Sequence, residues 1–167
     1  MSKKFSTSTL IQKIEKLTKQ RMAEQPVVEL NQFREVKNKL NPINILVIED
    51  DETQRSSLKR ILESDGYYPK LAADAAELTQ ILDDDQEIHF IILDVGLPWI
   101  NGFEIAQMIK DHRDLKSIPL IFLSAQAEST DFDRAREVGA DDYIKKPFDI
   151  DKLKSRIKEL ISEKNQK

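Results

Sequence analysis

Just past the middle of this 167-residue chain lies the run His89-Phe90-Ile91-Ile92-Leu93-Asp94-Val95-Gly96-Leu97-Pro98. Its apolar part is too short for a helix and too uniform for a half-exposed strand, so it predicts a central strand covered on both faces. Gly96 and Pro98 then turn the chain. Asp94 should therefore stand at the carboxyl end of a buried strand, the edge where open parallel α/β sheets bind ligands.

From residue 43 onward, short apolar strands alternate with amphipathic helices. We expect strands at 43–48, 67–71, 89–94, 120–123 and 142–145, and helices at 52–63, 74–82, 102–110, 130–138 and 149–162. Alternation with short joints predicts an α/β fold with helices on both faces of a parallel sheet. The expected sheet has five strands in the flavodoxin-like order 2-1-3-4-5. Its second helix should turn Leu78, Ile81 and Leu82 toward the core.

The first 41 residues differ from the rest in charge. They carry nine Lys or Arg against four Glu, a net charge of +5, which leaves −9 on the remainder of a chain whose total is −4. Two amphipathic helices are predicted here, the first from Thr9 to Glu24 and the second between Pro26 and Asn41. We therefore expect a basic helical extension over 1–41, one domain over 42–163 and a tail over 164–167.

Composition excludes several classes of protein. No run approaches the length of a membrane span, and the first residues lack the apolar stretch of a signal peptide. The absence of cysteine excludes disulfides, thiolate metal sites and thiol nucleophiles. We expect a cytoplasmic protein that does not bind membranes.

Acidic residues follow the first strand. In the expected strand order, Glu49 and Asp50 lie beside Asp94, and such like charges repel unless a cation lies between them. Carboxylates without His or Cys suit Mg²⁺, which prefers oxygen ligands. The alternative is that these acids bind no metal and lie in the first turn of the next helix, where the helix dipole favours negative charge. We prefer this alternative for Asp51 and Glu52. For Glu49 and Asp50 we prefer the metal site.

Two other polar side chains are expected at the same edge. Ser124 ends the fourth strand, and Lys146 follows the fifth. A hydroxyl, an ammonium and a divalent cation around one carboxylate can grip a tetrahedral phosphoryl group, with Asp94 as the nucleophile. Taken singly, either residue is more often a turn residue or a solvated charge, but their shared placement favours a joint role.

Four motifs, in this order, resemble the receiver domain of two-component response regulators. They are Ile45–Asp51, Leu93–Asp94 with Leu97–Pro98 and Asn101–Gly102, Ser124–Ala125, and Gly139–Phe148. The resemblance covers 43–162 and implies a stand-alone, chemotaxis-regulator-like phosphoprotein that is not an enzyme. The implied phosphodonor is a sensor histidine kinase, a histidine phosphotransfer protein or a small acyl phosphate.

The resemblance also implies roles for individual residues. Asp94 is the implied phosphoacceptor, Glu49 and Asp50 are the acidic metal pair, and the backbone carbonyl of Gly96 is a further ligand of Mg²⁺. The absence of a side chain at Gly96 should leave the phosphoryl group less shielded from water than in many relatives. Gln126 is a second candidate for controlling that water.

The remaining implied roles concern the switch. Ser124 and Lys146 would bind the phosphoryl oxygens, and Tyr143 is the aromatic residue whose side chain follows Ser124. The peptide bond between Lys146 and Pro147 is expected to be cis. Trp99, the only tryptophan, is interpreted as a residue of the pocket rim.

Other functions are weighed against this one. A phosphatase of the haloacid-dehalogenase type also uses an Asp nucleophile and Mg²⁺, but it needs a second acid where this chain has Gly96. A receiver-shaped docking module that does not depend on phosphorylation is a further alternative. The basic extension over 1–41 is expected to form a homodimer or to dock on a partner protein, and DNA binding is disfavoured because its apolar stripes require burial.

Overall fold

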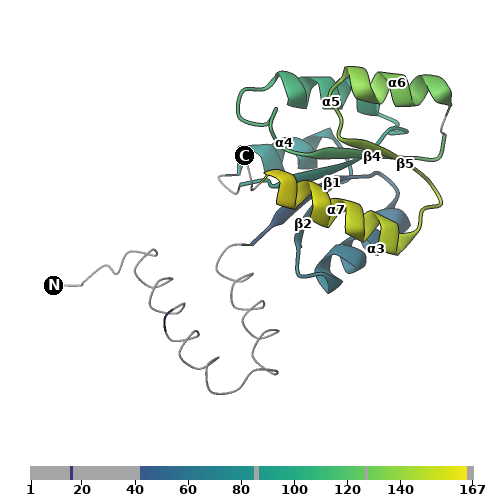
Figure 1. The fold of residues 1–167 in the computed structure, drawn as a ribbon. Coiled ribbons are helices and arrows are strands. Elements are labelled where there is room, and N and C mark those ends of the chain that lie inside the picture. The colour runs from purple at the N-terminus through teal and green to yellow at the C-terminus, as the bar shows by residue number, and fades with distance from the viewer. Residues whose placement is uncertain (1–15, 17–41, 85–86, 127, 165–167) are drawn as a thin grey trace. The chain divides into compact units, whose positions relative to one another are not determined.

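A computed structural model describes residues 16, 42–84, 87–126 and 128–164 (Figure 1). The chain divides into two compact units, Met1–Pro42 and Ile43–Lys167. Apart from Lys16, which is helical, the residues of the two helices predicted over 1–41 lie outside the described ones. No described helix is both long enough and apolar enough to cross a membrane.

Strands and helices alternate throughout the second unit, with bounds within two residues of those predicted. In chain order they are β1 (Asn44–Ile48), α3 (Glu52–Ser64), β2 (Tyr68–Ala72), α4 (Ala75–Asp83), β3 (Phe90–Asp94), α5 (Gly102–Asp111), β4 (Leu120–Ser124), α6 (Ser129–Glu137), β5 (Asp142–Lys145) and α7 (Ile150–Lys164). The strands form one parallel sheet in the order β2-β1-β3-β4-β5, which confirms the predicted topology.

The sheet is covered on both faces, with α3 and α7 on one side and α4, α5 and α6 on the other (Figure 1). Successive side chains of a strand point to opposite faces, so each strand contributes to both cores. In β3, Ile91 and Leu93 pack toward α4, α5 and α6, whereas Phe90 and Ile92 pack toward α3 and α7. This arrangement explains why the central strands are apolar without interruption.

The prediction that Leu82 of α4 belongs to the core is wrong. Leu78 is buried and Ile81 packs against the core, but Leu82 is 38% exposed. Leu82 lies on the flank of the apolar stripe, and α4 ends one residue later. A helix this short buries only the residues at the centre of its stripe.

Side-chain caps start the helices that follow the strands. Asp51 accepts a hydrogen bond from the backbone N–H of Gln54, so it caps α3 and lies at the positive end of this helix. Asn101 caps α5 in the same way through Phe103 N–H. Such caps typically contribute about 1 kcal/mol each. Both also begin a helix directly beside the carboxyl edge of the sheet.

Candidate functional site

An acidic cluster lies where β1 and β3 end side by side. The strands pair through Ile48 and Leu93, so the residues that follow come together at one edge. Carboxylate oxygens of Glu49, Asp50 and Asp94 all lie within 4.8 Å of one another. Glu49 and Asp94 are buried and Asp50 is exposed, so the cluster opens to solvent on one side.

Lys146 inserts one positive charge into this cluster. Its Nζ donates a 2.6 Å hydrogen bond to Glu49 Oε2 and lies 3.3 Å from Asp94 Oδ1. The backbone N–H of Lys146 donates to Ser124 O at 2.7 Å, and the following peptide bond to Pro147 is cis, as expected. The sequence had placed the ammonium at this edge, and the structure joins it to two of the three carboxylates.

The pKa of Glu49 is raised above its ordinary value. Burial is the main cause and the charge of Asp94 adds to it, whereas Lys146 and the N–H of Asp51 act in the opposite direction. A buried carboxylate beside a second one is unfavourable unless positive charge compensates it. One ammonium does not balance three carboxylates, so this site favours an additional cation.

Glu49→Gln should change how stability depends on pH. The folded-state pKa of Glu49 is raised, so the wild type loses free energy of unfolding as pH rises from 4.5 through that pKa. Glutamine does not ionise, so the free energy of unfolding of the variant should rise relative to that of the wild type through this range. Urea unfolding in EDTA at acid and neutral pH measures this. A pH-independent difference, like that expected for the exposed Glu52→Gln control, would contradict it.

The donor set fits a hard divalent cation. The clustered ligand atoms are all carboxylate oxygens, which suit Mg²⁺ rather than a metal that prefers nitrogen or sulfur. Gly96, whose carbonyl was predicted as a further ligand, is exposed next to this cluster. A Cβ atom at Gly96 would lie 3.8 Å from Asp94 Oδ2. Position 96 therefore borders the carboxylate of Asp94, with room for a side chain.

Gly102 packs closely against the backbone of Asp94 and Val95, a contact that the sequence motif alone did not reveal. Its N–H donates to Val95 O at 3.1 Å. A Cβ atom at Gly102 would lie only 2.5 Å from Asp94 O and 2.7 Å from Val95 Cα. Only glycine lets the start of α5 pack this closely on the turn after β3.

Ser124 and Tyr143 are both joined to the backbone of Gln126. Ser124 is buried, and its Oγ accepts a 3.1 Å hydrogen bond from Gln126 N–H. The Tyr143 hydroxyl donates a 2.6 Å hydrogen bond to Gln126 O. The Tyr143 ring is buried against Phe122 and Phe132. A single residue thus links the hydroxyl at the sheet edge to the aromatic ring between α5 and α6.

Trp99 and the two histidines make structural contacts. Trp99 is half-buried, and its Nε1 donates to Ala73 O at 3.3 Å, which ties the loop after β3 to the loop after β2. His89 Nδ1 accepts the backbone N–H of Asn44, and His112 Nδ1 accepts that of Asp114. Neither histidine is part of the acidic cluster.

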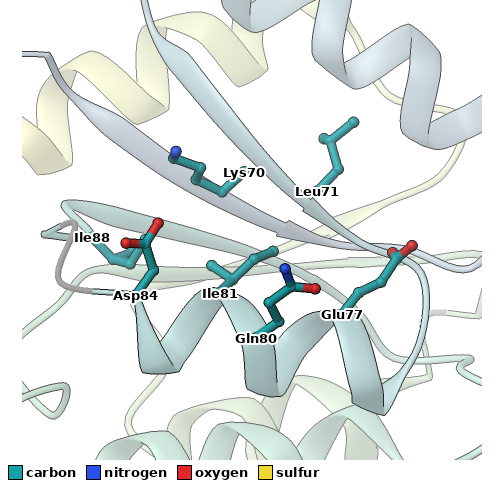
Figure 2. Close-up of a pocket in the computed structure, with 7 residues that line it drawn as sticks. All are labelled: Lys70, Leu71, Glu77, Gln80, Ile81, Asp84 and Ile88. Atoms are coloured by element: carbon teal, nitrogen blue, oxygen red, sulfur yellow. The ribbon is translucent and has the colours of Figure 1, made fainter.

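A cavity of about 310 Å³ lies between β2 and α4 (Figure 2). Its lining residues are Lys70, Leu71, Glu77, Gln80, Ile81, Asp84 and Ile88. None of the acidic cluster residues lines it. The cavity is therefore separate from the site at the carboxyl ends of β1 and β3.

Residues 45–158 match the family model of the response regulator receiver domain. This chain belongs to the response regulator receiver family. It is therefore a receiver domain of a two-component system, a signalling module with an acidic pocket formed by Glu49, Asp50 and Asp94. The family implies that the receiver works with a histidine kinase.

Known receivers are similar in sequence and in fold. The aerobic respiration control protein ArcA of Escherichia coli K12 is 38% identical over 119 residues, which cover 71% of this chain and 48% of ArcA. The non-phosphorylated HemR receiver domain of Leptospira biflexa is 36% identical with a TM-score of 0.63, over 72% of this chain and 94% of that receiver-domain chain. A CheY-like receiver of Methanospirillum hungatei is 28% identical with a TM-score of 0.68, over 75% and 98%. The chain spans about half the length of ArcA.

Proposed function

We propose that this receiver accepts a phosphoryl group on Asp94 and thereby switches a protein-binding surface. The observation that carries the proposal is the position of Asp94, buried between the acidic pair and Lys146 at the carboxyl edge of the sheet. The donor would be the phosphohistidine of a sensor kinase or of a phosphotransfer protein, or a small acyl phosphate. Mg²⁺ would be held by Glu49, Asp50, Asp94 and the carbonyl of Gly96.

The chemistry follows from the charges around Asp94. One of its carboxylate oxygens forms a bond to phosphorus in line with the breaking bond to the donor nitrogen or oxygen, so catalysis is positioning and charge compensation. Bound Mg²⁺ supplies charge that neutralises phosphoryl oxygens. Lys146 already lies 3.3 Å from Asp94 Oδ1 and would contribute the second positive charge to the transferred group.

The switch would run through Gln126. When the Ser124 hydroxyl turns to a phosphoryl oxygen, the N–H of Gln126 loses its present acceptor. The carbonyl of Gln126 holds the Tyr143 hydroxyl, so a shift of this residue changes the position of the ring. We propose that the surface of α6, β5 and α7 changes as a result and is the output of the switch.

Gly96→Asn should lengthen the lifetime of the phosphorylated state. A side chain at this position begins 3.8 Å from Asp94 Oδ2 and would shield the acyl phosphate from the attacking water. We expect the half-life to increase several-fold, measured as loss of the phosphorylated mass after removal of the donor. The exposed Gln126→Ala variant serves as a comparison that tests the other candidate for control of this water. An unchanged or shorter half-life in Gly96→Asn would refute the role of position 96.

We also propose that residues 1–41 form a separate extension of the domain at 42–163, that 164–167 form a tail, and that the whole chain acts in the cytoplasm. The net charge of +5 on the extension contrasts with the acidic remainder and supports a separate role, either homodimerisation or docking on a partner. Light scattering of the full chain and of a chain that begins at Asn41 tests the dimer. Equal subunit numbers for the two chains would exclude it.

A further inference from the structure

Arg55 grips three consecutive backbone carbonyl groups at the acidic pair. Its Nη1 donates to Glu49 O at 2.9 Å and to Asp50 O at 2.8 Å, while its own backbone N–H donates to Asp51 O at 2.9 Å. The first two carbonyls lie in the short segment between β1 and α3. A single half-buried side chain thus fixes the backbone that carries two of the three clustered carboxylates.

From these contacts we infer that Arg55 is a positioning residue for the divalent cation site, an inference that rests on the proposed function. The peptide unit that contains Asp50 O also contains the N–H of Asp51, because the unit is planar and rigid. That N–H donates to Glu49 Oε1 at 3.2 Å. By holding Asp50 O, Arg55 orients the N–H that aims the carboxylate of Glu49.

The hydrogen bond from Arg55 to Glu49 O has a corresponding effect on Asp50. Holding Glu49 O fixes the peptide unit that leads into Asp50, whose carboxylate is the exposed member of the cluster. An exposed side chain gains little orientation from packing, so its direction depends on the backbone that carries it. Arg55 therefore acts on both acids through main-chain groups and contacts neither carboxylate directly.

Positioning and simple charge predict opposite effects on cation affinity. A guanidinium beside a cation site repels the cation, so if charge alone mattered, removal of Arg55 would tighten binding. If Arg55 orients the ligands, its removal loosens the site and weakens binding, as loss of groups that orient metal ligands usually does by a factor of ten or more. The sign of the change therefore separates the two effects.

The experiment is an NMR titration of the full chain with MgCl₂. We compare the wild type with Arg55→Met, which keeps the length of the side chain without its donors, and with Arg55→Lys, which keeps the charge without the planar fork. Arg60→Met, an exposed arginine of the same helix, controls for the loss of one positive charge. We expect about tenfold weaker Mg²⁺ binding in Arg55→Met, an intermediate loss in Arg55→Lys and no loss in Arg60→Met.

Two further measurements test whether Arg55 positions the metal ligands. In the metal-free protein, the amide resonance of Asp51 should shift in Arg55→Met and stay in place in Arg60→Met, because only the former frees the peptide unit that bonds Glu49. With acetyl phosphate as donor, Arg55→Met should be slow at limiting Mg²⁺ and should recover most of its rate at saturating Mg²⁺.

Equal or tighter Mg²⁺ binding by Arg55→Met would overturn the inference. If that variant does not fold, Arg55→Lys decides, and wild-type affinity in Arg55→Lys would overturn it. Failure of the proposed function would look different, since the wild type itself would then bind no Mg²⁺, or Asp50→Asn would bind it as well as the wild type does.

Discussion

Asp94→Asn is expected to gain no phosphoryl group from acetyl phosphate and Mg²⁺, whereas the wild type gains the mass of one. The amide lacks the anionic oxygen that attacks phosphorus, and it removes one of the three carboxylates that gather within 4.8 Å. Intact mass spectrometry after incubation with the donor measures this directly. The result would be a loss of the entire signal rather than a reduction.

The matched control for this experiment is Asp133→Asn, an exposed aspartate on α6. It should be phosphorylated as fast as the wild type. If Asp94→Asn gained the same adduct as the wild type, the phosphoacceptor would be another residue. If neither protein gained it with Mg²⁺ present, the chain would be a docking module and the proposed chemistry would be wrong.

Lys146→Met should have the second largest effect, slowing phosphorylation about a hundredfold or more. The ammonium lies 3.3 Å from Asp94 Oδ1 and is only 14% exposed, so its charge is little screened by solvent. Methionine fills a similar volume but cannot compensate the incoming phosphoryl oxygens. Initial rates with acetyl phosphate at saturating Mg²⁺ measure the loss, which added Mg²⁺ should not restore.

The same substitution should also destabilise the metal-free protein. It removes the 2.6 Å partner of Glu49, whose side chain is 2% exposed, and the removal of one partner from a buried ion pair costs about 3–5 kcal/mol. The loss should be smaller at acid pH, where Glu49 takes up a proton. Lys145→Met, which changes the exposed neighbouring lysine at the end of β5, is the control. Equal phosphorylation rates in the two variants would exclude a role for Lys146 in charge compensation.

Much of this site could be predicted because a parallel sheet brings distant residues together by topology. In β1, β3 and β4 an apolar run continues to the carboxyl end, and a polar residue follows the last apolar one. Strand order then determines which ends are neighbours, so the placement of Glu49 and Asp50 beside Asp94 required no knowledge of side-chain contacts. The prediction that Leu82 is buried was wrong because the burial of a residue at the flank of an apolar stripe depends on how the helix packs on its sheet.

The sequence by itself determined the fold class, the order of the strands and the edge at which the acids, the hydroxyl and the ammonium meet. Only the tertiary structure decided that Lys146 bonds Glu49, 97 residues away, and that Arg55 holds the backbone carbonyls of Glu49 and Asp50. Hydrophobic periodicity specifies which face of an element is buried, to a precision of one residue. Hydrogen bonds between side chains and distant backbone groups depend on peptide-plane and rotamer geometry at the ångström scale, which appears only when the elements have packed.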